Sequence, residues 1–347
     1  MVTDAHNIYF SDTFVFVLLR KNIIIKIINM KSIKVTSFTE SKGLIWTEMP
    51  DPEVTQGQVL IKIDAAGVGM VDILMSKGMY PDVKEPGFIP GFEVAGTVIS
   101  VADENNKAWV GKRVYAMTSF GGYAEKVAVN AEALVEIPDN VTAVDAVGLG
   151  INALVAQISL ERGQFRAGQE VFIRGASGGI GSSVAVVAIA NGGVVTATAS
   201  STEKDSKLKS IGVQTMSTTN SNKNLSERFD IIIDPVAGKD IANFVPLLKD
   251  NGRYIINGVA GGFPEVSFFN TFLLSFQRSL NLSFLSLNSI AIDELKGRLK
   301  DIFGMAAKGG LNPVIDEVLP LPDALKAHQR IESGSVFGKI VLISISL

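Results

Sequence analysis

The stretch that most constrains the fold of this chain is residues 171–190, which read VFIRGASGGIGSSVAVVAIA. An apolar, β-branched strand leads into a loop with four glycines and then into a helix rich in alanine and valine. Glycine lets the backbone turn sharply and approach a ligand, and a helix start presents free N–H groups and partial positive charge. This turn suits a pyrophosphate, so we predict that the loop binds a dinucleotide.

The glycine spacing is weak evidence when taken alone. It is G-x-x-G-x-x-G and not the usual G-x-G-x-x-G, and any tight strand-to-helix turn can produce such a pattern. The context favours nucleotide binding because a second strand, residues 194–200, follows the helix as in a βαβ unit. A purely structural turn is the alternative.

The end of that second strand indicates which cofactor is bound. A site for NAD would have an Asp or Glu there to accept from the ribose 2′-hydroxyl, but this strand continues as TATASSTEK. Ser200, Ser201 and Thr202 offer hydroxyl groups instead. Lys204 adds a positive charge, which fits a 2′-phosphate, so we predict NADPH. The alternative is a solvated turn in which Thr202 caps the next helix, and the nearby Glu203 argues for that alternative.

Length and charge restrict the possible partners. A chain of 347 residues is long for one core, so two domains are expected, and 47% hydrophobic residues suffice to build them. The formal net charge of −3 gives no long-range attraction to nucleic acid or anionic lipid. We therefore expect small-molecule partners.

The chain contains no cysteine, which excludes disulfides, thiolate nucleophiles and cysteine-based zinc sites. His6 and His328 are the only histidines, and they lie near opposite ends of the sequence. We interpret His328 as a surface residue on a C-terminal helix. The acidic residues form no cluster with metal-ligand spacing, so no metal is predicted.

Residues 1–29 differ from the rest of the chain. Asp12, Arg20, Lys21 and Lys26 interrupt their apolar runs, so a membrane-spanning helix is not expected. The positive charges follow the first apolar run, which is unlike a signal peptide. We interpret this segment as an upstream extension without a required fold, and a marginal membrane-surface anchor is the alternative.

Two patterns follow the extension. Short strands with turn signals, typical of a partly open β-barrel, are predicted at residues 58–63, 93–101, 113–117 and 123–129. A helix at 144–160 then precedes an alternation typical of a parallel sheet covered on both faces. Its strands are predicted at 171–174, 194–199, 230–233 and 253–257, and its helices at 180–190, 202–210 and 239–249. The chain closes with a helix near 292–308, a strand near 314, a helix at 323–332 and a strand at 339–345.

From Met30 onward the chain resembles the zinc-free quinone oxidoreductase branch of the medium-chain dehydrogenase/reductase superfamily. The resemblance rests on GVGMVDILMSKGMYP, PGFEVAGTV, GKRV, GGYAE, GASGGIG, ATASSTEK, DPVAG and GKIVL, in that order. It implies a GroES-like catalytic domain formed by residues 30–147 and 286–347. An NADP-binding Rossmann domain, residues 148–285, would be inserted between these parts, with the cleft at the junction.

The resemblance also implies which residues bind the cofactor. The pyrophosphate loop would be Gly178, Gly179, Ile180 and Gly181. The 2′-phosphate site would be Ser200, Ser201 and Lys204. Strand ends facing the nicotinamide ribose would contribute Asp234, Val236, Gly258 and Val259.

Two candidate catalytic residues, Asp72 and Tyr80, match the family's stretch beside the nicotinamide. Tyr80 would orient the substrate or pass a proton, and packing under the domain junction is the alternative. Asp72 is expected to cap a helix over residues 72–77 more than to act as an acid or base. Gly69 departs from the family, whose members usually carry Asn there.

Zinc-bearing relatives polarise an alcohol oxygen with a metal held partly by cysteine, so alcohol oxidation is disfavoured here. A conjugated acceptor delocalises the charge that hydride addition creates and needs less help. We predict a cytoplasmic NADPH-dependent reductase of quinones or α,β-unsaturated carbonyls. The resemblance also implies a homodimer, for which residues 263–287 are the candidate interface, and a tetramer is the alternative. The alternative is a non-catalytic NADPH-binding protein with a structural or regulatory role.

Overall fold

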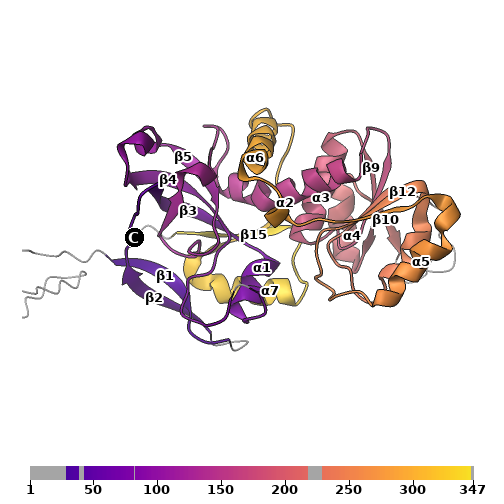
Figure 1. Cartoon of the computed structure of the whole chain (residues 1–347), viewed down its shortest axis with the longest axis horizontal. Helices are drawn as coiled ribbons and strands as arrows, with labels where there is room; N and C mark the ends of the chain where they lie inside the picture. The colour runs from indigo at the N-terminus through magenta and orange to yellow at the C-terminus, as the bar shows by residue number, and fades with distance from the viewer. Residues whose placement is uncertain (1–28, 39–42, 82, 218–228, 345–347) are drawn as a thin grey trace, which may run out of the picture.

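The computed structural model describes residues 29–38, 43–81, 83–217 and 229–344. These form two lobes side by side, with one long helix between them (Figure 1). The extension predicted for residues 1–29 lies outside the described residues, except for Asn29, which begins the first strand.

The first lobe contains a curved sheet with the strand order β14-β15-β3-β4-β5-β7, and β6 pairs with β3. Two further strands, β1 (Asn29–Val35) and β2 (Leu44–Pro50), form an antiparallel pair. The strands of the curved sheet are β3 (Gln58–Val68), β4 (Glu93–Val101), β5 (Arg113–Met117), β6 (Lys126–Asn130), β7 (Leu134–Glu136), β14 (Ile315–Pro320) and β15 (Lys339–Ile343). This is a GroES-like lobe, as predicted.

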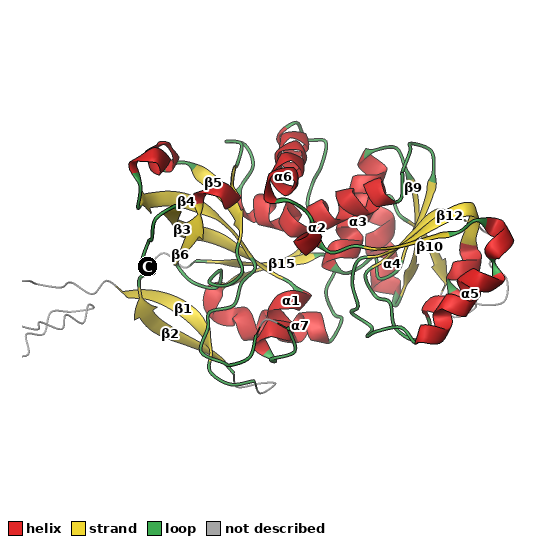
Figure 2. Ribbon diagram, viewed as in Figure 1, coloured by secondary structure: helices red, strands yellow, loops and turns green. Residues whose placement is uncertain are grey.

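The end of the chain returns to this first lobe. β15 pairs antiparallel with β3, and Ile340 lies opposite Val68. The adjoining helix α7 (Ala324–Glu332) lies beside α1 (Met70–Ser76) at the lower edge of the lobe (Figure 2). The two ends of the described chain therefore build one lobe together.

The second lobe is a six-stranded sheet of the Rossmann type, with the order β10-β9-β8-β11-β12-β13. All of its neighbouring strands are parallel. The strands are β8 (Glu170–Ile173), β9 (Val194–Ala199), β10 (Gln214–Ser217), β11 (Phe229–Asp234), β12 (Leu248–Ile256) and β13 (Asn281–Phe284). Among its helices are α3 (Gly179–Ala190), α4 (Thr202–Ser210) and α5 (Phe269–Leu274). The predicted α/β class is confirmed.

The helix predicted over residues 239–249 is wrong. Two short 3-10 turns, Ile241–Asn243 and Val245–Leu247, stand there, and β12 already begins at Leu248. Pro246 lies in the middle of the segment, where it lacks an N–H and its ring clashes with the preceding turn of an α-helix. Ile241, Val245, Leu247 and Leu248 are buried all the same.

The helix between the lobes is α2 (Ala143–Arg162), and it is broken at Gly150. It is long and apolar enough to cross a membrane, but 72% of its apolar window is buried inside the protein. The amphipathic helix α6 (Ile292–Ala307) packs against it. We conclude that α2 is a core helix of the fold.

Candidate functional site

The glycine loop predicted to bind pyrophosphate lies at the start of α3. A side chain on Gly181 would place its Cβ 2.3 Å from the carbonyl oxygen of Gly175, so the turn closes only with glycine. Gly178 caps the helix without a side-chain hydrogen bond, and no acidic residue stands in the first turn. Ile180 is half-buried against the core. The first N–H groups of α3 therefore lack a side-chain acceptor, which fits an anionic ligand.

The residues predicted to bind a 2′-phosphate lie together where β9 leads into α4. Ser201 is the N-cap, and its Oγ accepts the Lys204 N–H at 3.2 Å, so the cap is not Thr202. The Lys204 Nζ donates to the carbonyl oxygen of Gly334 at 2.6 Å, and burial lowers its pKa. Ser200 is exposed. Two hydroxyl groups and one ammonium group thus follow the end of β9, which lies beside β8 in the sheet.

The ends of β11 and β12 lie side by side. The Asp234 carboxylate is fully buried and accepts four hydrogen bonds, from the Arg174 guanidinium, the Tyr254 hydroxyl and the N–H groups of Val236 and Ala237. Gly258 and Val259 adjoin the same loop, where a Cβ on Gly258 would lie 2.7 Å from the Pro235 oxygen. The side chain of Asp234 therefore holds the loop, and contacts to a cofactor would come from the backbone or from the Val236 and Val259 side chains.

Two residues of this region were not predicted from the sequence. Arg174 lies buried behind the glycine loop, where it also contacts Asp240 and stacks 4.1 Å from the Phe244 ring centroid. The signal for it was an arginine at the end of an apolar strand. Asn152 of α2 is 7% exposed, and its amide nitrogen lies 2.7 Å from where a Cβ on Gly179 would be. No local pattern in the sequence indicated that contact.

Asp72 lies within α1 and is not its first residue, since the helix begins at Met70 with Gly69 as its N-cap. The Asp72 carboxylate reaches back to the Gly69 N–H at 2.8 Å and also accepts the Gly91 N–H at 3.1 Å. Gly69 has no side chain of its own to cap the helix, and the acid three positions later supplies the acceptor. Burial raises the pKa of Asp72 to about 6. The expected capping role holds, with a helix start two residues earlier.

Tyr80 follows α1 and is half-buried. Its ring contacts Phe92 edge-to-face, with the ring centroids 6.4 Å apart. Phe92 immediately precedes β4 and adjoins Gly91, the residue that Asp72 holds. Tyr80 and Asp72 are thus connected through the segment at 91–92.

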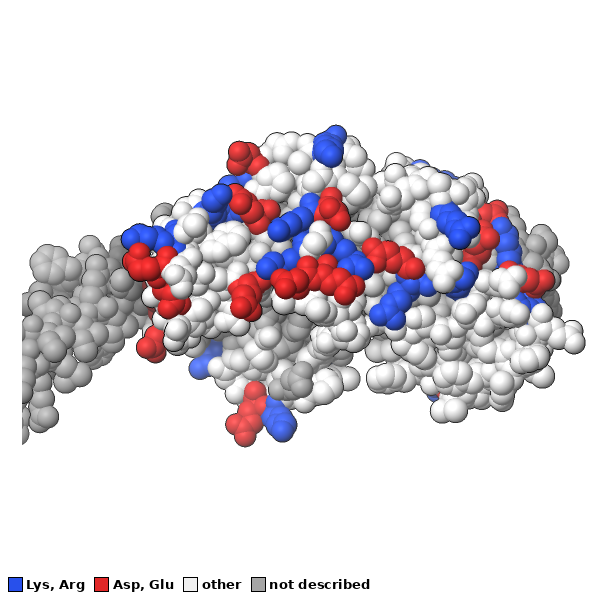
Figure 3. Space-filling model, turned by 45° about the horizontal axis from the view of Figure 1, so that its top comes forward, with Lys and Arg blue, Asp and Glu red and all other residues white. Residues whose placement is uncertain are grey.

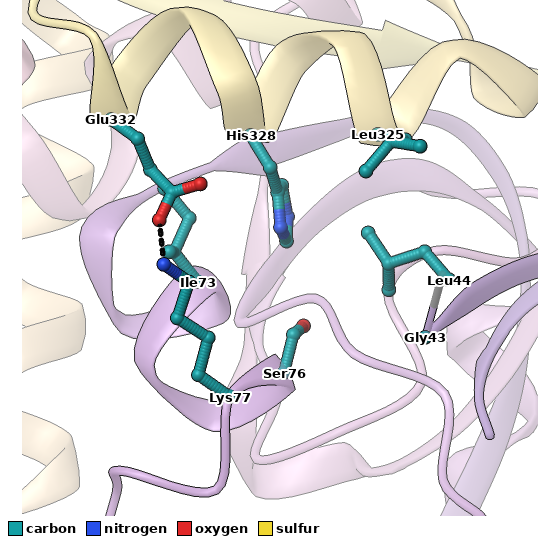
Figure 4. A pocket seen from close by; sticks show the side chains of 8 residues that line it. All are labelled: Gly43, Leu44, Ile73, Ser76, Lys77, Leu325, His328 and Glu332. Atoms are coloured by element: carbon teal, nitrogen blue, oxygen red, sulfur yellow. Dashed lines mark ion pairs between the residues drawn. The ribbon is translucent and has the colours of Figure 1, made fainter. Parts of the chain in front are cut away.

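The interpretation of His328 as a surface residue is wrong. His328 is 4% exposed, and its Nε2 lies 3.2 Å from the buried Tyr123 hydroxyl. Figure 4 shows its ring pointing from α7 into a small pocket that Leu44, Ile73 and Ser76 also line. The apolar face of α7 must be covered by the lobe, and His328 lies on that face. Burial lowers the pKa of His328 to about 4, with Lys77 adding to the shift.

This shift predicts a pH-dependent stability. The unfolded chain protonates His328 near its ordinary pKa, whereas the folded protein does so only near 4, so stability is lost as the pH falls between these values. We expect the unfolding free-energy difference between wild type and His328→Gln to grow by roughly 3 kcal/mol from pH 4 to pH 7. The raised pKa of Asp72 makes stability change with pH in the opposite direction. Asp72 is present in both proteins, so its contribution cancels in the difference between them. Urea unfolding at both pH values measures the difference, and a constant one would contradict the assignment. Gln329→Ala, at an exposed neighbour, is the control.

No group of three or more His, Asp or Glu side chains that could hold a metal ion occurs among residues 29–38, 43–81, 83–217 and 229–344. The chain as a whole has no cysteine. The side chains described above offer hydrogen-bond donors and two carboxylates, Asp72 and Asp234, that are each engaged by backbone N–H groups.

Comparison with known proteins identifies the family. Residues 55–139 match the family model of the alcohol dehydrogenase GroES-like domain, and residues 209–342 match that of the zinc-binding dehydrogenases. Mouse quinone oxidoreductase is 28% identical over 90% of this chain and 98% of its own length. The human synaptic vesicle membrane protein VAT-1 homolog-like is 26% identical over 85% of this chain and 75% of its own.

Solved structures give the same result. A mycobacterial protein complexed with NADPH superposes with a TM-score of 0.82 at 26% identity, over 90% of this chain and 99% of that one. The quinone oxidoreductase of Thermus thermophilus, also solved with NADPH, gives 0.73 at 27% identity, over 90% and 100%. The chain therefore belongs to the medium-chain dehydrogenase/reductase superfamily, on the side that holds the quinone oxidoreductases and the VAT-1 homologues.

Proposed function

We propose that the protein is a cytoplasmic, NADPH-dependent reductase that transfers hydride to a quinone or an α,β-unsaturated carbonyl without a metal. The observation that carries this proposal is the arrangement of two anion-binding features at adjacent strand ends. These are the uncapped start of α3 after β8 and the cluster of Ser200, Ser201 and Lys204 after β9. A pyrophosphate and a 2′-phosphate of one NADP molecule are the ligands that need both.

Each group of residues in the second lobe would hold one part of the cofactor. The N–H groups at Gly179, Ile180 and Gly181 would hold the pyrophosphate, and Lys204 with the two serines would hold the 2′-phosphate. Val236, Gly258 and Val259 would flank the nicotinamide ribose, on a loop that the side chain of Asp234 keeps in place. When bound, NADPH supplies the hydride.

The catalytic lobe has to orient the acceptor and support the charge that develops on its oxygen. Tyr80 carries a hydroxyl on a half-buried ring held against Phe92, and it would orient the substrate or pass a proton to it. Asp72, through its hydrogen bonds to Gly69 and Gly91, would keep the two segments beside Tyr80 together. A conjugated acceptor suits this set, because its own π-system spreads the charge that the available donors cannot fully neutralise.

The experiment that tests the proposal is a substrate panel. EDTA-dialysed protein is mixed with NADPH and a series of quinones, alkenals and simple alcohols or ketones, and the absorbance of reduced nicotinamide is followed. We expect turnover on conjugated acceptors and none on simple ketones. Tight NADPH binding with no turnover on any acceptor would favour the alternative, a protein that binds NADPH without catalysis. Activity restored only by added zinc would contradict the metal-free chemistry.

The proposal includes a homodimer formed through the open edge of the Rossmann sheet. β13 is the outermost strand in that sheet, and no strand of the described part of the chain pairs with its outer side. The segment between β12 and β13 carries the exposed apolar residues Phe263, Val266, Leu273, Leu274 and Phe276, and Phe284 of β13 is exposed as well. Figure 3 shows charged side chains across the middle and the upper right of one face of the molecule and few on its lower right. A second copy is the expected partner, since two β13 strands can pair and bury both patches.

Light scattering tests this assembly. We expect a mass of two chains at micromolar concentration, and a mass of one chain for the variant Leu274→Glu with Phe284→Lys. Both positions are exposed, 89% and 57%, so the substitutions should leave the fold of one copy intact. A single-chain mass for the wild type would refute the dimer. Val318→Lys, at an exposed apolar position of the other lobe, is the control and should leave the mass unchanged.

A further inference from the structure

A buried ion pair lies where α2 leaves the first lobe. Glu93 of β4 and Lys339 of β15 are 1% and 4% exposed, and the Lys339 Nζ donates to Oε1 of Glu93. The other carboxylate oxygen accepts the Tyr115 hydroxyl at 2.7 Å and the Ile151 N–H at 3.0 Å. Four elements, β4, β5, β15 and α2, therefore meet at one carboxylate.

The backbone is shaped around this carboxylate. Gly150 interrupts α2 with φ 21° and ψ −126°, and a Cβ there would lie 2.1 Å from the Glu93 Oε2. A Cβ on Gly67 of β3 would lie 2.4 Å from Oε1. The break at Gly150 starts a second helical segment, and the Glu93 carboxylate accepts at its first turn, where a negative charge is favourable. Glu93 thus acts as a cap supplied from another element.

Each end of the ion pair is connected to the glycine loop through a neighbouring residue: Glu93 accepts the Ile151 N–H, and Lys339 follows Gly338 in the chain. Asn152 follows Ile151, and its amide nitrogen is the nearest atom to the missing side chain of Gly179. Gly338 precedes Lys339, and its N–H donates to the carbonyl oxygen of Ser177 at 2.9 Å. One ion pair within the first lobe is therefore connected to the loop of the second lobe on two sides.

We propose that Glu93 and Lys339 are positioning residues, which fix the glycine loop against the catalytic sheet and so set where a bound nicotinamide lies relative to the substrate. The effect on the nicotinamide rests on the proposed function, whereas the positioning of the glycine loop does not. Among the described residues, the Glu93 and Lys339 side chains make their hydrogen bonds with each other, with Tyr115 and with Ile151, and their charges also act on the buried Asp72 carboxylate. The ion pair acts through the backbone of α2 and β15, whose neighbouring residues make the contacts.

The test uses the full chain with Glu93→Gln and Lys339→Met together, which removes both charges at similar volume and should preserve the fold. Hydrogen–deuterium exchange of the cofactor-free protein is measured over residues 175–181. We expect exchange there to be about fivefold to tenfold faster than in wild type. Single-turnover hydride transfer should be about tenfold to a hundredfold slower, because a misplacement of about 1 Å is enough to do this. Binding of NADPH should change much less than the transfer rate.

Two further variants keep the test decisive. Lys126→Met breaks the ion pair with Asp51 elsewhere in the same lobe and should leave exchange at 175–181 unchanged. Asn152→Ala keeps the ion pair, removes one contact to the loop and should also speed exchange there. Wild-type exchange at 175–181 in the double variant would overturn the proposal whatever Asn152→Ala shows, as would faster exchange spread evenly over the chain. Because exchange is measured without NADPH, it judges the positioning role even where the proposed reaction fails.

Discussion

Arg174→Met is expected to lower the unfolding free energy by about 3–5 kcal/mol, because it leaves the Asp234 carboxylate buried without its cation. Asp234 is 0% exposed, and the Arg174 Nη1 lies 2.8 Å from its Oδ2. The same guanidinium bonds the Ala237 carbonyl and Asp240. Methionine keeps most of the apolar stem of the arginine side chain. The loss of unfolding free energy therefore comes from the missing charge and its hydrogen bonds. Chemical denaturation followed by circular dichroism measures it.

Two further variants distinguish the effect of an unpaired buried charge from a general disruption of packing. Arg298→Met removes an ion pair with Glu161 near the surface and should cost at most about 1 kcal/mol. Adding Asp234→Asn to Arg174→Met removes the unpaired charge and should recover part of the loss, since an amide can still accept from Val236 and Ala237. A loss for Arg174→Met as small as that for Arg298→Met would contradict this account of the loop.

Lys204→Ala is expected to weaken NADPH binding by about tenfold to a hundredfold and NADH binding far less, as a charged hydrogen bond to phosphate contributes roughly 1.5–3 kcal/mol. In the cofactor-free protein the Lys204 Nζ is bonded to the Gly334 carbonyl. A phosphate would offer it a full negative charge in exchange for that neutral acceptor. Fluorescence titration with both cofactors gives the two dissociation constants.

The control for this prediction lies on the same helix. Lys209 is in the last turn of α4, at the opposite end from Ser201, and is paired with Asp205 at 2.8 Å. Lys209→Ala should leave the ratio of NADPH to NADH affinity unchanged. If Lys204→Ala weakens both cofactors equally, Lys204 does not recognise the 2′-phosphate.

Much of the fold could be predicted because its signals are local. The glycine loop, the alternation of strands and helices, and the turn-rich first third each appear within a few residues of sequence. The failures have equally specific causes. Pro246 breaks a stretch that otherwise has an apolar helical pattern. Gly150 interrupts α2, although the surrounding sequence reads as one apolar helix. The short edge strand β13 has too few residues to show a period.

The same difference between local and distant signals applies to the candidate site. Its glycines, serines and Lys204 occupy one continuous stretch, and the sequence predicted them together. The contacts that hold the site join distant residues: Tyr123 and His328 are 205 positions apart, and Glu93 and Lys339 are 246 apart. A single sequence carries no signal for such pairs, because a buried lysine and an exposed one look the same in it. The pairing of Arg174 with Asp234, 60 positions apart, was missed for the same reason.

Direct hydride transfer from NADPH to a conjugated acceptor is tested by following one isotope. EDTA-dialysed protein is given NADPH carrying deuterium at the transferable position of C4, together with an α,β-unsaturated carbonyl that the panel shows to react. We expect one deuterium on the β-carbon of the product and a solvent proton on the α-carbon, at a rate that added zinc does not raise. A product without deuterium, or a rate that depends on zinc, would contradict it.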